Sequence, residues 1–292
     1  MVRTVFLMMV VASACDGDDA PASGPDAAPG ADGAGEACAP EEIQGRYDVT
    51  YGGGDLYFSG RHDDAPPIRF STPRLSEGAC AYHGPSEAFC DPPCTDGRYC
   101  APEGACRAYP SAITVGAVAI EANGRRADAT SEWDTYSAGP LAGFASPGDR
   151  VTLEVEGAGA VDPFTAETTV VPPLVLTSTQ LVAHEHEDLV VSWPAPSEAS
   201  PPGTRMIVHF DNDHHGVPAF IECDADDAAG SLTIPAPLLD ALILDGETGI
   251  GTYIENAWMA RRQATLRRTS LGCARFASHS EEHVFVETVR AP

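Results

Sequence analysis

The distribution of cysteine is the feature of this chain that most restricts its fold. Nine cysteines occur in 292 residues, and four of them fall within positions 90–106, where CDPPCTDGRYCAPEGAC places Pro, Gly or Asp between almost every pair. Such a cluster predicts a small loop-rich knot held by covalent bonds. Zinc is the alternative, but Cys90 and Cys94 make only a loose knuckle, and Cys100 and Cys106 add no second one.

The first residues predict that the chain is exported. Arg3 precedes an apolar stretch at positions 4–12, TVFLMMVVA, which is too short to cross a bilayer. Ala12, Ser13 and Ala14 then lead into Cys15, and small residues directly before a cysteine resemble the bacterial lipoprotein cleavage site. The resemblance implies a signal peptide at 1–14 and a lipid on Cys15. The alternative is an ordinary secretory signal that is cut near the same place.

Positions 15–42 predict a flexible tether. Between positions 16 and 42 there are eight Asp or Glu, no basic residue, and no Leu, Ile, Val or aromatic residue. Such a stretch cannot bury enough apolar area to offset the entropy of ordering, so we expect a disordered acidic segment that carries the lipid anchor.

The remaining cysteines are even in number once Cys15 is set aside for lipid. An even count in an exported protein predicts disulfides. The residues expected to form them are Cys38, Cys80, Cys90, Cys94, Cys100, Cys106, Cys223 and Cys273. The pairing of the six early cysteines stays open. Cys223 and Cys273 are far from the others in sequence, so we expect them to pair with each other.

Short apolar runs between turn residues begin at position 111 and predict β-structure. Beyond 176 the pattern is clearer, because apolar side chains at every second position indicate a strand with one buried face. The alternating residues are Leu189, Val191, Trp193, Met206, Val208, Phe210, Ala219, Ile221, Cys223, Leu232, Ile234, Val284 and Val286. Positions 252–266 fit either a strand or a short helix.

The fold class that follows is mainly β, with two β-sandwich-like domains after a small disulfide-rich knot and a disordered N-terminal tether. We expect a small β segment with the knot at 43–110, one sandwich-like domain at 111–175 and another at 176–292. The last segment resembles a fibronectin type III or immunoglobulin-like sandwich, since a strand ending in Trp193 is followed by Pro-Ala-Pro and more alternating strands. Only Tyr253 is a candidate for the tyrosine usual in a later strand of that fold.

Several short segments also resemble a group of cysteine-rich surface lipoproteins of myxobacteria. They are EGAC at 77–80, FCDPPC at 89–94, CRAYP at 106–110, HGVPAFIEC at 215–223 and GSLTIPAPLL at 230–239. The resemblance implies a place at the cell envelope and a modular architecture. That group has no established activity, so the resemblance implies no function.

Two polar turns of the last segment combine histidines with carboxylates. In a fibronectin-like sandwich both turns would lie at the same pole, and imidazole with carboxylate suits Zn, Cu or Ni. The alternative is two turns that never meet, since turns are commonly polar. The candidate metal ligands are His184 and His186 in the first turn, and Asp211, Asp213, His214 and His215 in the second.

The second turn also fits part of a calcium loop. Asp211, Asp213, Gly216 and Glu222 occupy positions one, three, six and twelve of that pattern. His215 breaks position five and the flanking residues alternate as strands, so we disfavour calcium.

No catalytic set is expected. His279 and His283 belong to an H-x-x-E-H pattern, but that motif needs a helix, whereas the residues after it read as a strand. The chain has no G-x-S-x-G elbow, and every cysteine except Cys15 is expected to be paired. We therefore predict that the protein is not an enzyme, and keep an exported hydrolase only as a remote alternative.

The charge of the chain excludes one class of partner. Its 43 Asp and Glu against 17 Arg give a net charge of -26, which disfavours nucleic acid because phosphate contacts need a basic surface. Four arginines still lie close together, and we expect them to neutralise the protein's own carboxylates rather than to bind an acidic partner or lipopolysaccharide phosphate. They are Arg261, Arg262, Arg267 and Arg268.

The function expected from the sequence is that of an exported, membrane-anchored lipoprotein at the outer membrane or cell surface. It would act as a non-enzymatic binding or structural module that meets the bacterial membrane through its lipid and binds an unknown protein or glycan partner. The second hypothesis is a divalent-metal-binding envelope protein that uses the histidine and carboxylate turns.

Overall fold

A computed structural model describes residues 38–290, with gaps at 69, 86–87, 102, 134, 196–199, 213–218 and 246–252. Strands dominate these residues, so the expected mainly β class is confirmed. Cys15, the signal segment 1–14 and most of the tether lie outside the described residues. In the part of the chain that is described, none of the helices has the length and apolar character needed for a membrane crossing.

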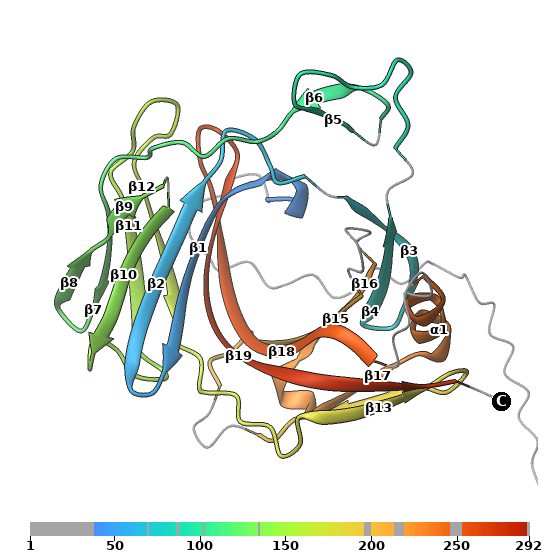
Figure 1. Cartoon of the computed structure of the whole chain (residues 1–292). Helices are drawn as coiled ribbons and strands as arrows, with labels where there is room; N and C mark the ends of the chain where they lie inside the picture. The colour runs from blue at the N-terminus through green and yellow to red at the C-terminus, as the bar shows by residue number, and fades with distance from the viewer. Residues whose placement is uncertain are drawn as a thin grey trace, which may run out of the picture. The chain divides into compact units, whose positions relative to one another are not determined.

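Most strands belong to one 11-stranded sheet (Figure 1). In order across the sheet they are β3 (Ser71–Glu77), β4 (Cys80–Pro85), β16 (Phe220–Asp226), β15 (Arg205–Asp211), β18 (Tyr253–Arg268), β19 (Cys273–Val289), β1 (Ile43–Gly52), β2 (Asp55–His62), β10 (Thr135–Ala142) and β9 (Thr130–Glu132). The last member, β13 (Gln180–His184), pairs in parallel with the far end of β19.

Three smaller sheets and three helices complete the described fold. A four-stranded sheet runs β12 (Phe164–Thr169), β11 (Arg150–Val155), β7 (Val118–Ala122) and β8 (Arg125–Asp128). Two ribbons pair β14 (Leu189–Ser192) with β17 (Ser231–Ile234), and β5 (Arg98–Cys100) with β6 (Cys106–Ala108). The helices are α1 (Ala236–Asp245) and the 3-10 turns η1 (Pro40–Glu42) and η2 (Asp227–Ala229).

The C-terminal strands have the pairing of an immunoglobulin-like sandwich. Strands β15, β16, β18 and β19 form one sheet, and β14 pairs with β17 in the other. Counted from β13, the second and fifth strands are β14 and β17, and the third, sixth and seventh are β15, β18 and β19. In the immunoglobulin fold these two groups lie in different sheets, as they do here. The alternation that predicted these strands is confirmed, since Val191, Val208, Ile221 and Ile234 are all fully buried in one core.

Two features of this region differ from the expectation. Tyr253 is 45% exposed and stacks on Phe285, so it is not the core tyrosine of a late strand. Helix α1, which the sequence analysis missed, follows β17 and buries Leu238 and Leu242 against the same core.

A second core lies between the four-stranded sheet and the β1–β2–β10 part of the large sheet. Val49 and Phe58 from the large sheet meet Ile120 and Leu153 from the small one. The β18–β19 hairpin contributes to both cores, with Phe276 in this one and Met259 in the other. Strands of the 43–110, 111–175 and 176–292 segments therefore share sheets and cores.

Gly53 and Gly54 form the tight turn between β1 and β2. Their φ values are 64° and 92°, a region that suits glycine because it lacks a Cβ.

All eight cysteines expected to form disulfides do so, but the expected Cys223–Cys273 pair is wrong. Cys38 bonds to Cys273 and Cys80 to Cys223, while Cys90–Cys100 and Cys94–Cys106 close the knot around β5 and β6. The reason is topological: β4 adds to the edge of β16, which places Cys80 directly opposite Cys223.

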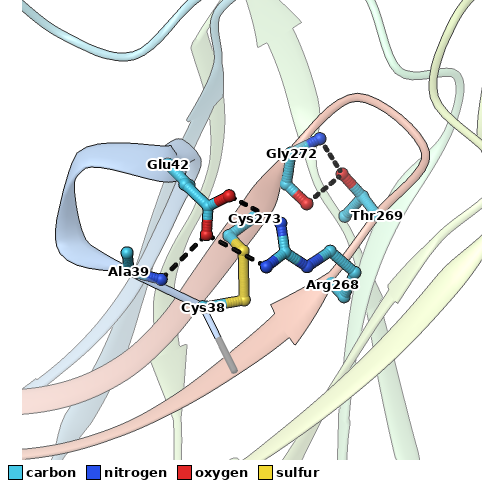
Figure 2. Close-up of a disulfide and its surroundings, with 7 residues drawn as sticks. All are labelled: Cys38, Ala39, Glu42, Arg268, Thr269, Gly272 and Cys273. Atoms are coloured by element: carbon cyan, nitrogen blue, oxygen red, sulfur yellow. Dashed lines mark hydrogen bonds and ion pairs between the residues drawn. A yellow bond between two sulfur atoms is a disulfide. The ribbon is translucent and has the colours of Figure 1, made fainter. Parts of the chain in front are cut away.

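The Cys38–Cys273 bond fixes the start of the described chain to the beginning of β19 (Figure 2). Beside it, Glu42 accepts two hydrogen bonds from Arg268 at 3.0 Å each and one from the Ala39 backbone at 2.9 Å. The chain ahead of β1 is thus held by both a covalent bond and an ion pair.

We expect the stability of the fold to decrease as the pH falls below about 6.5. His62 is fully buried, with Nδ1 at 3.1 Å from the Tyr47 hydroxyl, and burial lowers its pKa below the usual 6.5. The unfolded chain therefore takes up a proton more readily than the folded protein, and acid favours unfolding. The melting temperature should be lower at pH 5.5 than at pH 7.5, and replacement of His62 by Gln should reduce that difference.

The matched control is His283→Gln, because His283 is 76% exposed and should leave the pH dependence unchanged. If the melting temperatures of the His62→Gln variant and of the wild type changed equally with pH, this prediction would be contradicted.

Candidate functional site

Several side chains of the large sheet that point away from both cores are polar. Residues directly opposite one another on neighbouring strands share a face of the sheet. Five such partners form a continuous row across β15, β18, β19, β1 and β2, and we call it the donor row, because each member carries a hydrogen-bond donor. Its members are Arg205, Arg262, His279, Thr50 and Tyr57.

The charges around the donor row are unevenly paired. Arg205 donates to Asp224 Oδ1 at 2.6 Å, and Arg275 donates to Asp48 Oδ1 and Oδ2 at 3.1 and 3.3 Å. The ion pair of Arg262 with Asp224 Oδ2 is long, at 3.8 Å. Burial, together with the like charge of Arg275, lowers the pKa of Arg262. Arg262 is thus a half-buried cation whose nearest carboxylates are already engaged.

Thr50, His279 and Asp48 lie in the order of a nucleophile, a base and a carboxylate. Thr50 Oγ1 is 3.1 Å from His279 Nε2, and His279 Nδ1 is 3.7 Å from Asp48 Oδ1. Although burial opposes it, the hydrogen bond from His279 and the charge of Arg275 hold the pKa of Asp48 below its usual value. The Asp48 carboxylate therefore stays ionised and orients the side chains of His279 and Arg275.

The backbone of Thr50 is engaged in the sheet. Acyl transfer needs donors aimed at the developing oxyanion, commonly backbone N–H groups. Thr50 pairs with His279 on one side and with Tyr57 on the other, so its backbone belongs to two strand ladders. Any oxyanion donor would therefore have to come from another group of the site.

A row of stacked rings runs beside the donor row. His83 and Phe220 stack with centroids 4.5 Å apart, Phe220 and His209 are 5.0 Å apart, and His209 and Trp258 are 4.8 Å apart. The four rings come from β4, β16, β15 and β18. Trp258 precedes Arg262 by four residues on β18, which corresponds to about 13 Å along the same face.

Two buried polar atoms at the edge of this aromatic row have no hydrogen-bond partner. They are Nδ1 of His209 and Oδ1 of Asp211. Both residues lie on β15, just before positions 213–218, which are outside the described residues.

The expected metal ligands are not brought together where the structure describes them. The His186 backbone and ring donate to Asp240 of α1 at 2.8 and 3.0 Å, and its pKa is raised by that carboxylate. His184 pairs with Val289 and Asp211 with Asn256. Their strands are separated by β18 and β19, about 14 Å in all, which is too far to share one ion. Asp213, His214 and His215, and with them Gly216 of the calcium pattern, lie outside the described residues.

The only gathering of three possible metal-ligand atoms within the described ranges is that of Cys90, Cys94 and Cys106. All three sulfurs belong to disulfides, because Cys90 bonds to Cys100 and Cys94 bonds to Cys106. A zinc site needs thiolates, so the disulfide interpretation of the knot is the one the structure bears out.

The four clustered arginines mostly serve the protein's own carboxylates, as expected. Arg261, 1% exposed, donates to Asp227 at 2.9 Å, and Arg268 donates to Glu42 at 3.0 Å. Arg262 belongs to the donor row. Arg267 lines an open hollow of about 580 Å³ with Arg126 and Glu154.

The H-x-x-E-H pattern lies on β19, a strand, as its rejection anticipated. Its first histidine, His279, is the member of the donor row. The donor row itself was missed because its members come from positions 50, 57, 205, 262 and 279. The sequence indicates such a row only by polar side chains at the strand positions that lie between the buried ones.

The comparisons with known proteins add little to this geometry. No family model matches the chain, and no curated protein matches it. Among solved structures, the chain is similar to the crystal structure of chicken CNTN1 FN1–FN3 domains, with a TM-score of 0.18 and 7% identity, covering 77% of this chain and 68% of that one. A TM-score this low carries no argument, so the sandwich topology rests on the strand pairings above.

Proposed function

We propose that this protein is an exported, lipid-anchored module of the bacterial cell envelope that binds its ligand without catalysis. The observation that carries the binding role is the donor row, where donor side chains of five strands lie side by side and the ion pair of Arg262 with Asp224 is long, at 3.8 Å. Export is supported by four disulfides, because such bonds persist in oxidising compartments. The short segments that resemble myxobacterial surface lipoproteins agree with this placement.

The lipid anchor is tested by Cys15→Ser. We expect the wild-type chain to sediment with membranes and the variant to move to the soluble fraction, because without the cysteine no lipid can be attached. Mass spectrometry of the N-terminus should find Cys15 as a lipid-modified first residue in the wild type only. A variant that stays with the membranes, together with an unmodified wild-type N-terminus, would rule out the anchor.

A useful control for the same experiment is Ser13→Ala, which keeps a small residue before Cys15. It should leave membrane attachment unchanged, since the cleavage site requires small residues there rather than serine.

A further inference from the structure

The row Arg205–Arg262–His279–Thr50–Tyr57 contains one guanidinium that is only weakly paired, that of Arg262. Arg205 and Arg262 face each other directly across β15 and β18, and like charges in that position are destabilising. The carboxylates of Asp224, Glu222 and Asp48 all act on Arg262, but Asp224 lies close to Arg205 and contacts Arg262 only at 3.8 Å. The donors of Arg262 are therefore the ones left for an oxyanion.

A second observation points the same way. Nε of Arg275, next to this row, is buried without a hydrogen-bond partner, and Arg275 is close enough to Arg262 to act on it electrostatically. A guanidinium keeps its charge at any physiological pH and presents a planar fork that matches carboxylate and phosphate oxygens. An oxyanion near Arg262 would offset the repulsion between these cations.

The rest of the row offers a different chemistry. Thr50 and Tyr57 present hydroxyl groups, which both donate and accept hydrogen bonds, and Tyr57 is 45% exposed. On β18 the residue two positions after Arg262, on the same face, is Ala264, which is exposed. Its small side chain leaves room beside the row for the atoms of a ligand.

We propose that the donor row binds an acidic sugar of a glycan chain, with its carboxylate or phosphate group at Arg262 and its hydroxyl groups at His279 and Thr50, while Tyr57 contacts the next sugar. The row spans about 19 Å across five strands, which is longer than one sugar ring and fits a short stretch of a glycan chain. This inference rests on the proposed binding role and names its ligand class.

The test measures the binding of four small probes to the full chain with its disulfides formed. The probes are glucuronate, glucose 6-phosphate, neutral glucose and acetate, and titration calorimetry or ligand-observed NMR gives their dissociation constants. We expect at least one of the two acidic sugars to bind about tenfold or more tightly than glucose, since a hydrogen bond to a charged group is stronger than one between neutral groups. Acetate should bind more weakly than that sugar because it has no hydroxyl groups. Preference for glucuronate or for glucose 6-phosphate identifies which oxyanion the site takes.

Variants locate the site. Arg262→Gln should weaken the acidic sugar by about tenfold or more, and Thr50→Val should reduce its advantage over acetate. The matched control is Arg126→Gln, since Arg126 lies on β8 of the separate four-stranded sheet. Melting curves check that each variant folds. Arg262→Lys keeps the positive charge but loses the planar fork, so it should retain part of the binding.

The proposal fails if neither acidic sugar binds more tightly than glucose, if acetate equals the better sugar, or if folded Arg262→Gln binds as the wild type does. These outcomes are independent of Cys15, because the titration uses purified protein. Loss of the anchor and loss of the sugar site can therefore be told apart.

Discussion

Replacement of Asp227 by Ala should destabilise the fold by about 3–5 kcal/mol, because it leaves a buried guanidinium without its carboxylate. Arg261 and Asp227 are 1% and 3% exposed, and Arg261 Nε donates to Asp227 Oδ1 at 2.9 Å. The same arginine donates to the Pro173 carbonyl at 2.9 Å and to the Pro194 carbonyl. The midpoint of urea unfolding, followed by the fluorescence of buried Trp193, should shift accordingly.

The control for this prediction is Glu167→Ala. Glu167 pairs with Arg150 at 3.1 Å, but both side chains are more than half exposed, so the loss should stay below about 1 kcal/mol. A double variant, Arg261→Met with Asp227→Leu, should recover much of the stability, because no unpaired charge remains buried. If Asp227→Ala and Glu167→Ala cost the same, the buried pair does not have the role described.

Removal of the Cys38–Cys273 bond by a double change to Ala should cost a comparable amount, about 4.7 kcal/mol in the chain-entropy account. The bond joins residues 235 positions apart. The Cys80–Cys223 bond shortens the effective loop to roughly a hundred residues, for which that account gives this cost. Urea unfolding of the double variant, compared with the oxidised wild type, measures it.

The knot provides the matched control. Cys94 and Cys106 close a short loop with a separation of 12, and the residues around them belong to neither described core. In the same account a loop of about 15 residues gives about 3 kcal/mol, so their replacement by Ala should cost less than the loss of the Cys38–Cys273 bond. An equal shift of the unfolding transition in both variants would contradict the dependence on loop length.

The strands of the C-terminal part were predictable because their alternation is local. Leu189 and Val191 are buried while Val190 between them is 60% exposed, which is the period-two pattern seen in the sequence. The same pattern could not separate strand from helix at positions 252–266, where Arg261 and Arg262 interrupt it. Positions 253–266 belong to β18, which is held by β15 and β19 rather than by its own pattern.

The disulfide pairing could not be predicted because it depends on contacts that are distant in sequence. Cys273 begins β19, and β1 pairs with that strand in parallel, which brings the chain just before Ile43 to the same place. Sequence distance favoured a Cys223–Cys273 bond, but sheet topology gives each of them an early partner. The donor row has the same origin, since five strands must assemble before its side chains meet.

The bond at Cys38 also decides how the folded part would respond to a mechanical pull. Tension applied to the chain ahead of Cys38 passes through the disulfide directly to Cys273 and does not reach β1. Everything between these two cysteines lies in a covalent loop that a pull cannot extend. The load falls on β19, which is held by β18 along nearly its whole length and by β1 and β13 on its other side. A chain pulled in this way would resist shear at the strand common to both cores, and the donor row would keep its shape under load.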